Sequence, residues 1–293
     1  MVVEFVKHLK PEDCATYVVH KAFCLLTKLV DLWLEPAMYA SDVDLYDGGG
    51  NIAFANMSFF CLRTFQSSGF LTKHLRRFQK MVRERTRKSY QTFWKGLHED
   101  RARYTEQTAS ILGFFTSAEW VLGPSHLFEL PEKSLDISLT CALQIAEEWT
   151  DRTTEDFQIV HDESSAKARE KWMWDAIVSP SAPAATVGFP HRKRRYPLHV
   201  TGTRFENSKG NRQLQFADLL AGATAEWARG KMRKSDRRDY CSRLENAGLR
   251  NFLVGGMWPV PKVERLEGAT RRATGGSACF LWQTYPRCGD GGG

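Results

Sequence analysis

The 293-residue sequence contains no run of about 18 apolar residues, the length that a membrane-spanning helix requires. Its first residues also lack the long apolar stretch of a secretory signal. The seven cysteines are scattered, and none has the Cys-x-x-Cys or Cys/His spacing of a zinc site. These absences predict a cytoplasmic protein with reduced thiols, no membrane segment and no structural zinc.

Several catalytic motifs are absent as well. The sequence has no Gly-x-Gly-x-x-Gly or Walker pattern, which argues against a nucleotide cradle. It has no Gly-x-Ser-x-Gly elbow, and His20, His161 and His199 lie in strand-like segments without a paired cysteine or serine motif. Serine and cysteine hydrolase chemistry is therefore disfavoured.

Positive charge is abundant. The net charge of +7 and the sequence pI near 9.0 favour phosphate-bearing or other acidic partners. Residues 70–103 hold eleven Lys or Arg against three acids, residues 191–195 form a basic loop, and further cations follow between 229 and 238. Such runs are commonly solvated faces, but three of them beside an acidic site would form a track for a phosphate backbone.

The first half of the sequence predicts a strand followed by a long helical region. β-branched and aromatic residues favour a strand at 17–20. Residues 23–34 are apolar on several faces and fit either a buried helix or a buried strand. Apolar residues then recur every three or four positions from about 56 to 150, with helices expected at 90–104 and 131–150.

The second half changes period and predicts an α/β layer. The expected order is strand, helix, strand, helix at 157–161, 166–177, 198–205 and 214–229. We therefore expect one α/β domain over 1–254, with a mixed sheet flanked by helices and the helical region at about 56–150 as an insertion. Residues 255–293 are glycine-rich and are expected to be a largely disordered tail.

One candidate site residue follows the strand expected at 157–161. Asp162, with Glu163 beside it, lies at the carboxyl end of a strand, where α/β sheets build their sites. A carboxylate there can ligate a divalent ion while the strand fixes its position. The alternative is structural: Asp162 caps the next helix or accepts hydrogen bonds from backbone amides in a turn.

The second candidate lies in the helix expected at 214–229. This helix is apolar nearly all round, which predicts burial, and Asp218 is too far from its start to cap it. Gln215, Ala221 and Gly222 share its face by their spacing, and small residues there leave room for a ligand. A buried carboxylate needs a cation, a strong donor or a raised pKa, so Asp218 is either a functional acid or one half of a structural ion pair.

The two acids lie in segments that resemble a known family. Residues 208–223, SKGNRQLQFADLLAGA, resemble the C-terminal signature of the domain-of-unknown-function 3800 family, and residues 160–165, VHDESS, resemble its middle acidic motif. The run LQFADLLAGA is the specific part of a resemblance that spans residues 1–230. The family is ribonuclease-H-like, with a mixed sheet flanked by helices and with acids from different elements that meet at one edge.

The resemblance implies a metal-dependent phosphodiesterase that acts on DNA or RNA. Asp162 and Asp218 would be metal ligands and, together with Glu163, catalytic residues, and the cofactor would be Mg²⁺ or Mn²⁺. Basic side chains would hold the nucleic-acid backbone on either side. The residues expected to do so are Arg192, Lys193, Arg194, Arg195, Lys209 and Arg212.

The sequence departs from the family pattern at its start. The family opens with a strand that carries an Asp-Glu-Ser-Gly motif and supplies a central acid, and no such motif occurs among the first residues here. Two functional hypotheses follow. The first is a metal-dependent nuclease, intact or inactivated by loss of that strand; the second is a non-catalytic nucleic-acid or protein-binding module on the same scaffold.

Overall fold

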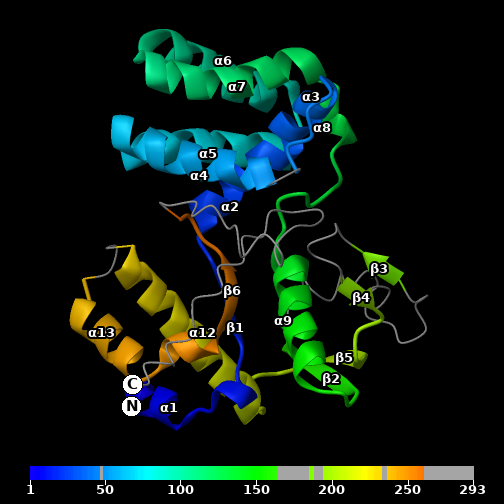
Figure 1. Cartoon of the computed structure of the whole chain (residues 1–293), viewed down its shortest axis with the longest axis vertical. Coiled ribbons are helices and arrows are strands. Elements are labelled where there is room, and N and C mark those ends of the chain that lie inside the picture. The colour runs from blue at the N-terminus through cyan, green and yellow to red at the C-terminus, as the bar shows by residue number, and fades with distance from the viewer. Residues whose placement is uncertain (47–48, 164–184, 188–193, 233–235, 261–293) are drawn as a thin grey trace, which may run out of the picture.

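The computed structural model describes residues 1–46, 49–163, 185–187, 194–232 and 236–260. These residues form two lobes arranged along the long axis of the molecule (Figure 1). We call residues 21–137 the helical lobe, and residues 1–20 together with 138–260 the α/β lobe. The helix expected at 166–177 and the tail beyond residue 260 lie outside the described residues.

The helical lobe contains seven α-helices and one π-helical turn among its described residues. In chain order they are α2 (Lys21–Leu29), the π-helical turn η2 (Val30–Leu34), α3 (Glu35–Tyr39), α4 (Gly50–Phe65), α5 (Ser68–Glu84), α6 (Arg87–Arg103), α7 (Glu106–Leu122) and α8 (His126–Glu129). Residues 23–34 are therefore helical, which decides between the two structures that their sequence allowed. The helical pattern expected from residue 56 onward is confirmed.

Local capping defines the corner between α5 and α6. Ser67 begins α5 by accepting a hydrogen bond from the backbone N–H of Phe70, at 3.2 Å. The helix ends where Arg85 adopts a left-handed conformation, with φ of 50°. Thr86 and Ser89 then form a reciprocal capping box at the start of α6. The two long helices therefore fold back on each other through signals that lie within a few residues.

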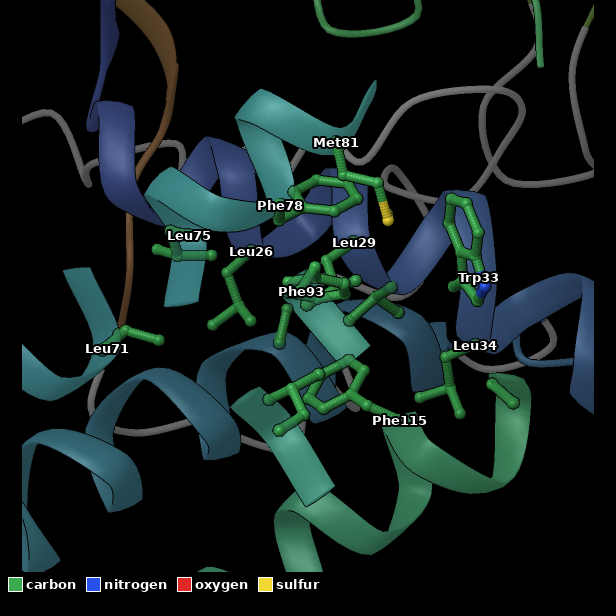
Figure 2. Packing of buried hydrophobic residues seen from close by; sticks show 14 of the residues in the cluster. Leu26, Leu29, Trp33, Leu34, Leu71, Leu75, Phe78, Met81, Phe93 and Phe115 are labelled. Atoms are coloured by element: carbon green, nitrogen blue, oxygen red, sulfur yellow. The ribbon is translucent and has the colours of Figure 1, made fainter. Parts of the chain in front are cut away.

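Large aromatic side chains fill the core of the helical lobe. Trp33, Phe78, Phe93 and Phe115 point into the space between the helices and are at most 1% exposed (Figure 2). The rings of Trp33 and Phe78 meet edge to face, with centroids 6.5 Å apart and planes at 89°. Each such side chain contributes about 2–3 kcal/mol through the apolar surface that it removes from water. This core holds the lobe together.

A buried polar contact crosses from α5 to α6 at the rim of this core. Asp100 accepts hydrogen bonds from Lys73 Nζ at 2.6 Å and from His74 Nε2 at 2.8 Å. Burial, reinforced by the charge of Lys73, lowers the pKa of His74 to about 4. Burial alone would raise the pKa of Asp100, but the hydrogen bond from Lys73 and the nearby His74 lower it overall. The histidine is thus neutral and the aspartate charged at neutral pH.

The α/β lobe combines short parallel strand pairs with helices. Its elements are α1 (Val2–His8), the 3-10 turn η1 (Pro11–Asp13), β1 (Thr16–Val19), α9 (Ser138–Arg152), β2 (Phe157–Asp162), β3 (Ala185–Val187), β4 (Arg194–Tyr196), β5 (Val200–Glu206), α12 (Arg212–Lys231), α13 (Arg238–Asn246), the 3-10 turn η4 (Leu249–Phe252) and β6 (Leu253–Met257). The strands expected near 17–20, 157–161 and 198–205 and the helix near 214–229 are confirmed. The protein is therefore of mixed helix and strand structure, as expected.

The first and last described strands form one parallel pair. In β1 and β6, Tyr17 pairs with Gly255 and Val18 with Gly256. A Cβ atom on Gly256 would lie 2.7 Å from the carbonyl oxygen of Val18, so only glycine allows the two strands to approach this closely. The expectation of a disordered tail from residue 255 is wrong for residues 255–257, because these glycines serve strand contact and not chain flexibility.

The second parallel pair joins β2 and β5 and carries helix α9 on one face. Ala146 of α9 packs with Leu198 and Val200, and Phe157 and Ile159 of β2 pack against this small cluster. The strands are only partly covered: no residue of β2 is buried, and Val200 is the one buried residue of β5. The remaining sheet, β3 with β4, is antiparallel.

Two expected boundaries differ from the structure. Helix α9 begins at Ser138 and not at Pro131, because the hydroxyl of Ser134 donates to the Pro131 carbonyl and Lys133 has a positive φ of 63°. The insertion also has different limits, since α2, η2 and α3 pack into the helical core whereas α9 packs on the β2–β5 pair. In the part of the chain that the structure describes, no helix is long and apolar enough to cross a membrane.

Candidate functional site

Three acids lie at the ends of strands β2 and β5. The strands are parallel, and their register places Asp162 directly beside Glu206. The pairing extends one residue further, because the backbone N–H of Glu163 donates to the carbonyl of Glu206 at 3.0 Å. The carboxyl edge of this strand pair therefore presents Asp162, Glu163 and Glu206 together, as expected for the first two.

A backbone amide holds Asp162. Its Oδ1 accepts from the N–H of Ser208 at 3.1 Å, while the side chain stays exposed. Asn207 Nδ2 donates to Glu163 Oε2 at 3.4 Å in the same turn. The structural alternative for Asp162, a hydrogen bond from a turn amide, is thus present, although the amide belongs to the turn after β5. This contact engages one oxygen of the carboxylate.

Glu206 is more firmly held than its neighbours. Its carboxylate pairs with Arg204 Nε at 2.8 Å and accepts from Asn211 Nδ2 at 2.6 Å. Asn211 also caps α12, since its side chain accepts from the N–H of Leu214 at 3.1 Å. Glu206 therefore ties the end of β5 to the start of α12 and is already neutralised by a cation.

Sequence reasoning missed Glu206 and Asn211. Glu206 could have been found from its position at the end of the second strand. When two parallel strands each end in an acid, the two acids are expected at the same edge of the sheet. Asn211, three residues before Leu214, also carries the signature of a helix cap.

Asp218 lies on the exposed side of α12. The prediction that Asp218 is buried is wrong, because the side of the helix that packs inward carries Leu220, Ala223 and Trp227 instead. Within the described residues, Asp218 makes no hydrogen bond or ion pair. It therefore needs no compensating cation, since its carboxylate remains hydrated.

Gln215, one helical turn before Asp218, holds the turn that follows β5. Its Nε2 donates to the carbonyl of Ser208 at 2.8 Å and to that of Lys209 at 3.3 Å. The N–H of the same Ser208 binds Asp162. Asp218 follows Gln215 by three residues and so lies on the same side of α12, one turn further from the strand ends. Asp162 therefore contacts the turn at 207–211 directly, and Asp218 lies one helical turn beyond the Gln215 side chain that holds the same turn.

Two of the six predicted nucleic-acid-binding residues lie at this turn. Lys209 and Arg212 are exposed at the start of α12, a helix of 20 residues whose N-terminal end favours anions. Neither makes an ion pair within the described part of the chain. Arg194 and Arg195 belong to strand β4, and Arg192 and Lys193 lie outside the described residues.

The acids do not by themselves form a cation cage. Among the described residues, no group of three or more His, Cys, Asp or Glu side chains could hold a metal ion. Of the four acids, Glu206 is paired with Arg204. The other three, Asp162, Glu163 and Asp218, have no cationic partner in the described residues. Mg²⁺ in phosphate-processing sites is commonly bound by one or two carboxylates together with substrate phosphates and water. The exposed carboxylates of Asp162, Glu163 and Asp218 are ligands of the chemical type that such an open site uses.

Comparisons with known proteins gave no match: no protein-family model, no curated protein and no solved structure is detectably similar to this chain. The function is therefore inferred from the residues and from their geometry.

Proposed function

We propose that the protein is a divalent-metal-dependent nuclease, with a ribonuclease-H-like arrangement of strand-end acids, that hydrolyses phosphodiester bonds in DNA or RNA. The observation that carries the proposal is the register of β2 and β5, which sets Asp162 beside Glu206 at the carboxyl edge of a parallel strand pair. Acids at the ends of neighbouring parallel strands are a common way to build a site in α/β proteins.

The distribution of charge around this edge supports a metal-dependent reaction. Lys209 and Arg212 offer an anion site at the start of α12, yet the exposed carboxylates of Asp162 and Glu163 lie on the same edge. A phosphate placed there would be repelled by these carboxylates unless a divalent cation lay between them. Mixed carboxylates and cations therefore fit a nuclease better than a simple phosphate-binding surface.

Asp162 and Asp218 are the residues that would hold Mg²⁺ or Mn²⁺. The Ser208 amide fixes one oxygen of Asp162 and leaves the other for a ligand, while Asp218 has no partner in the described residues. When bound, the ion would supply an activated water and stabilise charge on the phosphate. Lys209 and Arg212 would bind neighbouring phosphates, and Gln215 keeps the 207–211 turn in position through its two carbonyl contacts.

Single-residue variants test this assignment. We expect Asp162→Asn and Asp218→Asn each to lower the rate of Mg²⁺- or Mn²⁺-dependent cleavage of a labelled oligonucleotide by at least about 100-fold, because each loses a ligand charge. Asp156→Asn is a matched control, since Asp156 is an exposed acid at the opposite end of β2. Equal cleavage by wild type, both site variants and the control would show that the acids are misassigned.

A second candidate is a non-catalytic nucleic-acid-binding module. It is favoured by the ion pair between Glu206 and Arg204. It is also favoured because, among the described residues, no three metal-ligating side chains lie together. It predicts binding without cleavage in any divalent metal, and a salt dependence that weakens in Lys209→Gln/Arg212→Gln because two phosphate contacts are lost. Cleavage that depends on Asp162 eliminates this candidate.

A further inference from the structure

Helix α5 presents a row of exposed cations that the strand-end site does not use. Arg76, Lys80 and Arg83 follow one another at spacings of four and three residues and are all exposed. Residues at these spacings lie on one side of a helix, about 4.5–6 Å apart along its axis. We call these three residues the α5 basic face.

The α5 basic face is not needed for ion pairing within the fold. Arg76 and Arg83 make no ion pair within the described residues, and Lys80 meets only the exposed Glu84, at 3.6 Å. Two other cations of the same helix are structural: Lys73 binds the buried Asp100, and Arg77 packs so closely over Gly96 of α6 that a Cβ there would clash with its guanidinium. The contrast separates cations that hold the lobe together from cations that only face water.

The opposite side of α5 packs into the core of the helical lobe. Its apolar residues Phe70, Leu71, Leu75, Phe78, Met81 and Val82 are all buried. No large apolar side chain of α5 or α6 is exposed in the described residues. A helix that lies in a membrane surface needs a free apolar face to insert among lipids, and α5 has none. A regular row of cations on a rigid helix instead matches a polymer with evenly spaced negative charges.

The α5 basic face also lies away from the strand-end acids. Figure 1 shows α5 in the helical lobe, whereas β2, β5 and the start of α12 lie at the far end of the α/β lobe. The basic stretch at 70–103 and the acidic site therefore do not form one continuous track. Any ligand of the α5 basic face is bound at a second place.

We infer that the α5 basic face binds the phosphate backbone of a duplex nucleic acid, and so anchors a substrate at a distance from the strand-end site. This inference rests on the proposed function only in that nucleic acid is the ligand. Duplex DNA carries one charge per about 1.7 Å of its axis, which offers a phosphate to each of the three cations. Contacts of this kind are independent of base sequence and of divalent metal.

The test compares two triple variants that lose the same charge. Arg76→Gln/Lys80→Gln/Arg83→Gln removes the α5 basic face, and Lys7→Gln/Lys10→Gln/Arg243→Gln removes three exposed cations from the α/β lobe. Binding of a labelled 24-base-pair DNA duplex is measured in EDTA by fluorescence anisotropy at several salt concentrations. We expect the first variant to bind at least about tenfold more weakly at low salt, with the slope of log affinity against log salt smaller by about 2–3, and the second to bind like wild type.

The outcomes separate this inference from the proposed function. Weaker binding by the α5 variant alone supports the inference, whether or not the wild type cleaves. Equal binding by both variants and wild type overturns it, and cleavage that still depends on Asp162 would then leave the nuclease proposal standing. Binding to vesicles that contain phosphatidylserine, with no binding to the duplex, also overturns the inference.

Discussion

The two lobes differ in how deeply they bury their apolar residues. The helical lobe encloses Trp33, Phe59 and Phe93 almost completely, whereas no residue of strand β2 in the α/β lobe is buried. The first lobe is held by one continuous aromatic core, and the second by two smaller clusters around α12 and α9. The candidate site lies in the lobe with less packing, at strand ends fixed by hydrogen bonds from turns. The proposed chemistry would thus take place in a different lobe from the main hydrophobic core.

The largest expected effect tests this contrast directly. Phe93→Ala should lower the free energy of unfolding by about 3–5 kcal/mol, because it leaves a cavity in a core that cannot collapse around it. Val200→Ala, in the small cluster under α9, should cost only about 1–2 kcal/mol through the lost methyl groups. Urea denaturation followed by tryptophan fluorescence measures both. Equal costs would mean that the two lobes are equally well packed.

Acid should weaken the helical lobe through His74. The folded-state pKa of His74, about 4, lies below the ordinary value of 6.5. Between these pH values the unfolded chain binds a proton at His74 and the folded chain does not, so the folded state loses stability as the pH falls. The loss should approach about 2–3 kcal/mol by pH 4. The lowered pKa of Asp100 acts in the same direction at still lower pH, since its stabilisation is lost as the carboxylate becomes protonated.

Unfolding midpoints measured in urea from pH 7.5 to pH 4 test this expectation. His74→Gln keeps a donor for Asp100 but cannot titrate, so its stability should change less over that range. A variant with the same pH dependence as wild type would show that other groups cause the acid loss.

A pair of glycine variants sharpens the comparison within the α/β lobe. Gly256→Ala should destabilise by about 1–3 kcal/mol, because its Cβ would meet Val18 of the neighbouring strand at 2.7 Å. Gly222→Ala should stabilise by about 0.5–1 kcal/mol, because it lies in helix α12 with no atom within 4 Å of the added Cβ. Thermal melting of the two variants gives opposite shifts. A Gly256→Ala variant that melts at or above the wild-type temperature would contradict the close approach of β1 and β6.

The most local expected effect concerns the junction between β5 and α12. Asn211→Ala removes the cap of α12 and the amide that binds Glu206, and should cost about 1 kcal/mol. The change is local, so amide hydrogen exchange should quicken at Leu214 while exchange in α5 and α6 stays the same. Uniformly faster exchange would instead show that the two lobes unfold as one unit.

Much of the fold could be predicted from the sequence, because its signals are local. Three- and four-residue spacing of apolar residues revealed the helices of the helical lobe, and β-branched runs revealed β1 and β2. Boundaries failed where side chains formed turns that imitate a helix start, as at Pro131 and Ser134. The strand at Gly255 and Gly256 was missed because its glycines matter only through the approach of Val18, which is distant in sequence.

The candidate site was predicted less completely. The position of Asp162 at a strand end followed from the pattern of β2, but the companion acid Glu206 depends on which strand pairs with β2 and in what register. Asp218 was expected to be buried because apolar residues surround it in sequence. The helix leaves Phe216 53% exposed as well, so the apolar composition of α12 does not report its burial.

The pairing of β1 with β6 has a consequence for synthesis on the ribosome. Thr16–Val19 is made early, but its partner Leu253–Met257 leaves the ribosome more than two hundred residues later. The contacts of the helical lobe lie mostly within residues 23–130, so this lobe can fold while the chain is still growing. In the α/β lobe, β1 stays unpaired until β6 has been synthesised. A chain that ends before Met257 would therefore have a folded helical lobe beside an open strand edge.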